Sequence, residues 1–335
     1  MRPIVLIFSI ITTFSILILA KGIVLGQEID SLYYFPSPTD SNQIGVKTKN
    51  GKIILPAKFS KMPWNRFNTP ITTPYIQMHP QKENQSQNRL SPLIPCREVY
   101  DLNGNFLYFI QLFDNGPDYF SEGYRRIIKN GKMGYANQEG RVAIKPQFEF
   151  AGLFNYGYAI VYTSGWEVEY FAGGEHSRLV PKNKTSSYYL INKKGEKVAL
   201  LNKASSPLDY YYEGKYYPYP FHYSAKEKRL RDSINELPIL QAVTHHYTGS
   251  KIKNSVHWEI TGRPSPNFKF YTFSGFATDN WKERRLTLIV NLKGEIFRVH
   301  DEDCILDQIP LEKWLRAEIF SKIRRPSSLY FLGLR

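Results

Sequence analysis

Short apolar and aromatic runs recur along this chain, and turns centred on glycine separate them. These turns contain Gly51, Gly104, Gly131, Gly140, Gly195 and Gly294. Three of the glycines follow an asparagine, and Asn-Gly suits the positive φ angles of a two-residue type I′ hairpin turn. After Gly140, Val142 and Ile144 alternate with small or charged residues, which is the period of a strand with one buried face. The chain is therefore predicted to be mainly β and built from short hairpins.

A second pattern repeats across these turns with a spacing of 34 residues. Phe-Ser-Glu-Gly-Tyr at 120–124 and Phe-Asn-Tyr-Gly-Tyr at 154–158 place Phe, Gly and Tyr in the same order. An earlier stretch, 44–59, follows the plan of 133–148, with two glycines six residues apart and a phenylalanine eight residues after the second. Periods of this size are typical of arrays in which one unit cannot bury its own apolar face. We expect tandem hairpin units that share one interior.

Together these motifs resemble the WG-repeat (KWG-type) family in a divergent, exported bacterial form. The good match covers about 120–161, and weaker fragments lie at 42–59, 188–200 and 288–297. Met133 stands where the family has tryptophan, and its flexible side chain can fill the same apolar position. The repeat-defining residues are Phe120, Gly123, Gly131, Gly134, Gly140, Pro146, Phe148, Phe154 and Gly157. The resemblance implies a chain of tandem β-hairpins at the cell surface that acts as an interaction scaffold.

The first residues carry a pattern typical of export. Residues 3–20 hold no charge, and Arg2 and Lys21 flank them. Residues 1–26 are therefore predicted to be a signal peptide cleaved before Gln27, or else an uncleaved N-terminal anchor. The remainder is expected in the periplasm, at the cell surface or secreted.

Two cysteines, Cys96 and Cys304, are an even count in a chain predicted to be exported. Such a count permits one disulfide, which would tie the N-terminal β region to the last part of the chain. The alternative is two free, buried thiols that pack as small apolar groups.

Composition divides the remainder into three regions. Residues 27–205 are the predicted hairpin-repeat region, interrupted at 62–96 by a loop rich in Pro, Asn and Gln. Residues 206–223 are rich in Tyr and Pro and are predicted to be a linker. Residues 224–335 are predicted to form a smaller α+β region.

The C-terminal region carries signals of both secondary-structure types. Ser224 and Glu227 form a capping-box pattern that opens a helix ending before Pro238. A second helix is predicted over 311–323, where apolar residues fall on one face. Strand-like runs lie between the two helices, at 256–260, 268–276 and 286–299.

A search for catalytic or metal-binding patterns yields weak candidates only. His245 and His246 with His257, or His300 with the acidic residues 301–303, could be imagined as metal ligands, but solvated turn residues are the favoured interpretation. Neither a nucleophile elbow nor a phosphate-binding loop occurs in the sequence. The chain is therefore predicted to be non-enzymatic and without a cofactor. A hydrolase with an unrecognised C-terminal site, at His257 or Asp301, is kept as an alternative.

The formal net charge of +14 and the 24 tyrosines suggest a basic, aromatic binding surface. The candidate surface comprises Tyr210, Tyr211, Tyr212, Tyr216, Tyr217 and Tyr219. An exported chain is expected to meet an envelope or extracellular protein, or a polysaccharide, rather than nucleic acid. It would contact the membrane only through residues 3–20 if the leader is uncleaved. The alternative is that these tyrosines line β faces and that the charge is dispersed. The leading function is a protein-interaction scaffold, and the second is a glycan-binding module.

Overall fold

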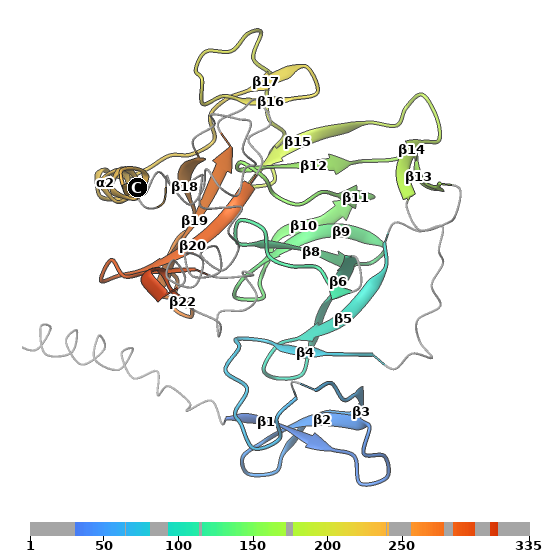
Figure 1. The fold of residues 1–335 in the computed structure, drawn as a ribbon. Coiled ribbons are helices and arrows are strands. Elements are labelled where there is room, and N and C mark those ends of the chain that lie inside the picture. The colour runs from blue at the N-terminus through green and yellow to red at the C-terminus, as the bar shows by residue number, and fades with distance from the viewer. Residues whose placement is uncertain are drawn as a thin grey trace, which may run out of the picture.

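The protein is mainly β, with antiparallel strand pairs throughout the part that its computed structural model describes (Figure 1). The described residues are 31–63, 65–80, 93–113, 116–171, 177–238, 240, 256–277, 284–298 and 309–313. The predicted leader, Cys304 and most of the predicted second helix lie outside these residues. This architecture confirms the predicted fold class of β-hairpin units with a small helix in the C-terminal part.

The N-terminal half forms two antiparallel sheets. The first has the order β1-β2-β3, and the second has the order β10-β9-β8-β6-β5-β4, with β7 paired to β6. A bridge between Ser60 and His79 joins the end of β3 to the start of the second sheet. The strands are β1 Leu32–Pro36, β2 Gln43–Thr48, β3 Ile53–Ser60, β4 Ile76–Met78, β5 Pro95–Tyr100, β6 Phe106–Phe113, β7 Gly116–Pro117, β8 Tyr124–Lys129, β9 Lys132–Asn137 and β10 Val142–Phe148.

The next unit continues the array and carries an insertion. Strands β11, β12 and β15 form a three-stranded sheet, while β13 and β14 form a separate two-stranded ribbon between β12 and β15. A short hairpin, β16–β17, follows. The bounds are β11 Phe150–Ala151, β12 Tyr158–Tyr162, β13 Trp166–Tyr170, β14 Ser177–Pro181, β15 Tyr188–Asn192, β16 Tyr210–Tyr212 and β17 Lys215–Tyr217.

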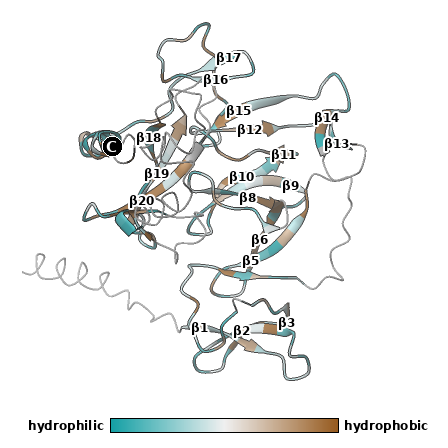
Figure 2. Cartoon of the chain, viewed as in Figure 1, coloured by the Kyte–Doolittle hydropathy of each residue, from teal (hydrophilic) through white to brown (hydrophobic). Residues whose placement is uncertain are grey.

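A third region, beside the array, combines a helix with a five-stranded sheet of order β18-β19-β20-β21-β22. The predicted capping box is present at the start of the helix, with Ser224 and Glu227 exchanging hydrogen bonds. Hydrophobic residues concentrate on strands such as β2, β6 and β20 (Figure 2). The bounds are α2 Ala225–Asn235, β18 Val256–Gly262, β19 Phe270–Ala277, β20 Arg284–Asn291, β21 Ile296–Arg298 and β22 Ile309–Pro310.

One turn geometry recurs in the repeat region and in the C-terminal sheet. In each copy a glycine with positive φ donates its N–H to the carbonyl three residues earlier, and that earlier residue's side chain accepts the next N–H. At Asn137 and Gly140, for example, the N–H of Arg141 bonds to Asn137 Oδ1 at 2.9 Å. The copies join Thr48 to Gly51, Asp101 to Gly104, Asn137 to Gly140, Asn192 to Gly195 and Asn291 to Gly294. We call this the glycine-bulge turn.

A different turn closes four other hairpins, and it corrects part of the prediction. Here both central residues have positive φ, as a type I′ turn requires. These pairs are Glu122-Gly123, Asn130-Gly131, Tyr156-Gly157 and Glu213-Gly214. Of the three Asn-Gly pairs that the sequence assigned to type I′, only Asn130-Gly131 adopts it. Asn50 and Asn103 precede glycines of the glycine-bulge turn, where the glycine alone has positive φ.

The two Phe-x-x-Gly-Tyr motifs are structurally equivalent. In both, the Gly belongs to a type I′ turn and the Tyr begins a strand. Tyr124 pairs with Asn137 in one unit, and Tyr158 pairs with Asn192 in the next. The β13–β14 ribbon in the second unit therefore stands where the first unit has the Asn130-Gly131 turn. The register of β12 with β15 is the same as that of β8 with β9.

Strand β10 crosses β9 at Gly134 more closely than a side chain would allow. A Cβ at Gly134 would lie 2.5 Å from the carbonyl oxygen of Ile144. Met133 and Tyr135, on either side of the glycine, pair with Phe148 and Ile144, so four residue steps on β10 face two on β9. The extra length makes β10 bulge over the glycine.

The N-terminal sheet repeats this crossing at Gly45. A Cβ there would lie 2.5 Å from the carbonyl oxygen of Leu55. Ile44 pairs with Phe59, and Val46 pairs with Leu55, which reproduces the register around Gly134. The shared spacing of two glycines and a phenylalanine therefore encodes one backbone geometry.

Consecutive units share an interior, as the repeat pattern predicts. Phe154 of the second unit lies between two rings of the first, with centroid distances of 5.0 Å to Tyr124 and 4.8 Å to Tyr135. Met133 is fully buried in this cluster. The buried members are Ile128, Met133, Tyr135, Ile144, Phe148, Ala151, Phe154, Ala159, Val161 and Ile191.

Two segments expected to be irregular are folded into the structure. The predicted loop at 62–96 contains β4, where Ile76 and Met78 are buried, although residues 81–92 lie outside the description. The predicted linker at 206–223 contains the β16–β17 hairpin and joins the core. Both segments look irregular in sequence because their strands are three residues long, too short to show a period.

We predict that Gly134→Ala destabilises the fold by about 1–3 kcal/mol, because the new methyl group must displace the backbone of β10. Gly116→Ala is the matched control, since a Cβ there meets nothing within 4 Å. Urea denaturation followed by circular dichroism measures both variants. Equal midpoints for Gly134→Ala and the parent protein would contradict the role given to this crossing.

Candidate functional site

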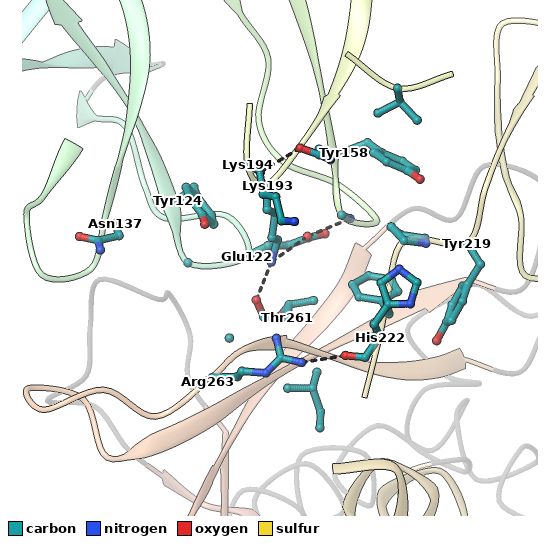
Figure 3. A pocket seen from close by; sticks show the side chains of 18 of the residues that line it. Glu122, Tyr124, Asn137, Tyr158, Lys193, Lys194, Tyr219, His222, Thr261 and Arg263 are labelled. Carbon is teal, nitrogen blue, oxygen red and sulfur yellow. Dashed lines mark hydrogen bonds and ion pairs between the residues drawn. The ribbon is translucent and has the colours of Figure 1, made fainter. Parts of the chain in front are cut away.

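A cavity of about 730 Å³ lies where the turns of the repeat region meet the C-terminal sheet (Figure 3). One wall consists of the turns at 122–124, 137–139 and 192–194. A second wall is the segment 218–223, and residues 260–263 at the end of β18 form a third. The site therefore combines three parts of the chain that are far apart in sequence.

The first wall is held by hydrogen bonds between consecutive repeat units. The Ser121 hydroxyl donates to the carbonyl of Phe154 at 2.5 Å, and Glu122 Oε2 accepts the N–H of Gly157 at 2.9 Å. Glu122 is fully buried and is the first of the two central residues of a type I′ turn. Side chains of one turn thus satisfy backbone groups of the next turn and fix the spacing of the wall.

Lys193 joins the repeat wall to the C-terminal sheet. Its ammonium donates to the carbonyl of Glu122 at 3.0 Å and to the carbonyl of Thr261 at 2.5 Å. The same Nζ lies 3.5 Å from the Glu122 carboxylate, which balances part of the buried negative charge. A single side chain from a glycine-bulge turn therefore connects two repeat units with β18, as Figure 3 shows.

The segment 218–223 is fastened to β18 through the buried carboxylate of Glu259. Tyr219 donates to its Oε1 at 2.6 Å, and Tyr223 donates to its Oε2 at 2.5 Å. Burial, and next the Glu259 carboxylate, raises the pKa of both tyrosines, so their hydroxyls stay protonated as donors. His257 Nε2 lies 2.8 Å from Glu259 Oε1. This network holds the second wall in place.

In the described part of the chain, the outer edge of β18 is covered by side chains and not by a further strand. Asn235, at the end of α2, accepts the N–H of Trp258 and donates to its carbonyl, both at 2.9 Å. The Tyr223 hydroxyl accepts the N–H of Ile260 at 3.1 Å. These contacts satisfy backbone groups that an edge strand would otherwise expose.

Basic side chains are concentrated at the rim of the cavity. Arg263 is bonded to Glu227 and to the carbonyl of His222. Lys194 and Lys197 are exposed residues of the lining, and Lys194 makes no side-chain hydrogen bond or ion pair with any described residue. The rim can therefore offer an ammonium group to an incoming anion.

The structure divides the predicted tyrosine surface into core and partly exposed residues. Tyr210 and Tyr217 are buried, so the prediction that they form an exposed surface is wrong for these two. Their rings pack with those of Tyr156 and Tyr158 in the cluster that joins the repeats to the hairpin. Tyr211, Tyr212, Tyr216 and Tyr219 are half-buried. Of the six, only Tyr219 lines the cavity.

The residues considered for catalysis or metal binding are not brought together in the described part of the chain. There, no cluster of three His, Cys, Asp or Glu side chains is arranged for a metal. His257 contacts Glu259, while His245, His246 and residues 300–303 lie outside the description.

The predictions about Cys96 and the leader stay open. Cys96 is buried on β5, but Cys304 lies outside the described residues, so their pairing remains a prediction. Among the residues that the structure covers, no helix has the length and apolarity needed to span a membrane.

Sequence reasoning missed the residues that build the cavity. Glu122 precedes Gly123 of the Phe-x-x-Gly-Tyr motif, and Lys193 lies two residues before Gly195, a predicted turn glycine; these positions were the available signals. Nothing in the sequence indicates that these two turns meet, or that Glu259 accepts hydrogen bonds from Tyr219 and Tyr223. Those contacts depend on how the C-terminal sheet packs against the array.

The turns, registers and shared interior define a β-hairpin repeat protein. Residues 133–165 match the model of a family described as the WG-containing repeat. The match begins at Met133-Gly134, where β10 crosses β9, and ends just before Trp166, the first residue of the β13–β14 ribbon. The predicted WG-type repeat is thus confirmed for this unit. No curated protein matches the chain in a sequence search.

We predict that Lys193→Met lowers the free energy of unfolding by about 2 kcal/mol, since it leaves the Glu122 carboxylate buried with less compensation. The value is set below that of a fully buried pair because the Lys193 side chain is 27% exposed. Lys194→Met is the control, and we expect it to stay within about 0.5 kcal/mol of the parent protein. Equal losses for both variants would contradict the bridging role of Lys193.

Alkaline pH is expected to destabilise the protein through its buried tyrosines. Burial is the first cause of a raised pKa for Tyr100, Tyr108, Tyr135, Tyr156, Tyr158, Tyr212, Tyr219 and Tyr223. In the unfolded chain, tyrosine loses its proton near pH 10. The contribution of these tyrosines to stability should therefore be constant below about pH 9 and fall above about pH 10, because only the folded state then keeps these protons.

Urea denaturation between about pH 8 and about pH 11, with phenolate absorbance recorded in parallel, measures this effect. Tyrosine ionisation should coincide with unfolding. Full ionisation near pH 10 of a protein that remains folded would contradict the prediction.

Proposed function

We propose that this chain is a non-enzymatic β-repeat scaffold of the cell envelope, which binds a protein partner through the β13–β14 ribbon. The observation that carries the proposal is the ribbon's partly exposed apolar face. The export pattern of the leader and the WG-type repeat support the same assignment. Strands β8 to β12 and β15 provide the rigid support from which the ribbon extends (Figure 1).

The ribbon is amphipathic across its two strands. Cross-strand partners share a face, and Trp166 pairs with Pro181, Val168 with Leu179. Tyr170 continues this apolar face, which is partly exposed: Val168 and Leu179 are half-buried, and Tyr170 is exposed. The opposite face carries Glu167, Glu169, Arg178 and Val180.

One end of the apolar face is anchored to the repeat array. The ring of Trp166 lies 4.8 Å from that of Tyr162 and 5.9 Å from that of Tyr188. Further along this face Tyr170 is 39% exposed, while Phe171, just past the end of β13, is 49% exposed and lies 5.5 Å from the guanidinium of Arg178 on the opposite face. An isolated two-stranded ribbon is marginally stable, and aromatic side chains on a rigid support are frequent anchors of protein interfaces. This combination favours a protein partner that covers the exposed end of the apolar face, at Tyr170.

The hydrolase alternative receives less support from the geometry around His257. Its Glu259 partner is fully buried and already accepts hydrogen bonds from Tyr219 and Tyr223. A carboxylate engaged in this way serves to hold the 218–223 segment against β18. We therefore assign the His257–Glu259 pair a structural role.

The proposal predicts a site-specific contact at the ribbon. A photo-crosslinking amino acid placed at Tyr170 should give one discrete adduct in producing cells, while the same group at the exposed Leu292 should give none. Adjacent residues of β14 provide the matched pair of variants. Leu179→Lys, on the apolar face, should abolish the adduct, and Val180→Lys, on the opposite face, should preserve it.

Immunoblotting of the irradiated cells reads the adducts, and circular dichroism confirms that each variant is folded. Loss of the adduct in both variants, or equal adducts at positions 170 and 292, would contradict binding through the apolar face.

A further inference from the structure

We propose that the cavity between the repeat turns and the C-terminal sheet binds an acidic saccharide, that is, a sugar carrying a carboxylate or phosphate group. This inference is independent of the ribbon, since no residue of β13 or β14 lines the cavity. It assigns a small-molecule site to the cavity, which takes no part in the proposed scaffold function.

The size and construction of the cavity suit a ligand of one or a few sugar rings. Its volume of about 730 Å³ lies within the range usual for pockets that hold small molecules. The walls are held by three sets of contacts: the Glu122–Gly157 hydrogen bond, the Lys193 bridge and the Glu259 network. Such a cavity is formed before the ligand arrives, so binding costs little ordering.

The lining combines aromatic rings with hydrogen-bonding groups. Tyr124, Tyr219 and Tyr223 are half-buried and His222 is exposed, and all four line the cavity. A pyranose has a face of C–H groups that packs on an aromatic ring, and an edge of hydroxyls that needs polar partners. Gln138 is among the polar residues of the lining, and so is Ser265. The Ser265 hydroxyl is shielded and has no hydrogen-bond partner among the described residues.

The charge of the lining selects for an acidic sugar. The four basic lining residues are Lys193, Lys194, Lys197 and Arg263, against two acidic ones, Glu122 and Glu139. Lys193 is engaged by Glu122, and Arg263 by Glu227 outside the lining. Lys194 is left to receive a ligand anion, and Lys197 lies 5.0 Å from the ring of Tyr189 close by. A charge-assisted bond to Lys194 would add to the stacking of the sugar ring.

The turn of Lys194 has a structural twin outside the cavity, which supplies a matched control. Lys194 stands in Asn192-Lys193-Lys194-Gly195, and Lys293 stands at the same position of Asn291-Leu292-Lys293-Gly294. Both turns have the glycine-bulge geometry, and in both the lysine N–H bonds to the asparagine side chain. Lys293 does not line the cavity. Substituting either lysine therefore removes one positive charge from a turn of the same backbone geometry.

Isothermal titration calorimetry of the purified full-length protein tests the proposal with three ligands. These are a uronic-acid tetramer, a tetramer of a neutral sugar and a hexose phosphate. We expect at least one acidic ligand to bind tenfold or more tightly than the neutral tetramer, and more weakly as salt is added. Comparing the uronic acid with the phosphate identifies the acidic group. Lys194→Gln should weaken acidic binding about fivefold to tenfold. Lys293→Gln should leave it unchanged.

Three outcomes would overturn the inference: no binding of either acidic ligand, equal binding of the neutral tetramer, or equal effects of the two lysine variants. Each would leave the ribbon and its crosslinking test untouched. Circular dichroism of the variants separates loss of binding from loss of folding.

Discussion

The close crossing of two backbones at a glycine is the constraint on which the repeat architecture depends. Because Gly134 lacks a side chain, β10 can bulge over β9 and direct Ile144 and Phe148 into the interior. The next unit then packs Phe154 against that interior. A methyl group at position 134 would push β9 and β10 apart, and the two units would move apart with them. The residue before the glycine, Met133, is fully buried in the same interior.

Polar contacts from three neighbouring segments converge on β18 of the C-terminal sheet. Lys193 reaches it from the repeats, Tyr223 from the segment before α2, and Asn235 from the helix itself. Each contact covers part of a strand edge that could otherwise pair with another chain. The same contacts leave a cavity between the sheet and the turns, so the attachment and the candidate site have one structural origin.

The local features of the fold could be predicted, and the long-range ones could not. Glycine spacing predicted hairpins, the repeated Phe-x-x-Gly-Tyr predicted equivalent units, and Ser224 with Glu227 predicted the start of α2. Each of these signals acts over a few residues. The candidate site differs, because Glu122, Lys193 and Thr261 meet only after three regions have packed. Tyr210 and Tyr217 show the same limit, since a tyrosine in a core and one on a surface look alike in sequence.

The ribbon between β12 and β15 has a consequence for how such a chain can diversify. The pairing of Tyr158 with Asn192 matches that of Tyr124 with Asn137, although one hairpin ends in a short turn and the other in an inserted pair of strands. Selection can therefore lengthen a hairpin tip and leave the ladder beneath it intact. Each tip is a separate place where new recognition can evolve, and a tip exchanged between homologues would carry its specificity with it.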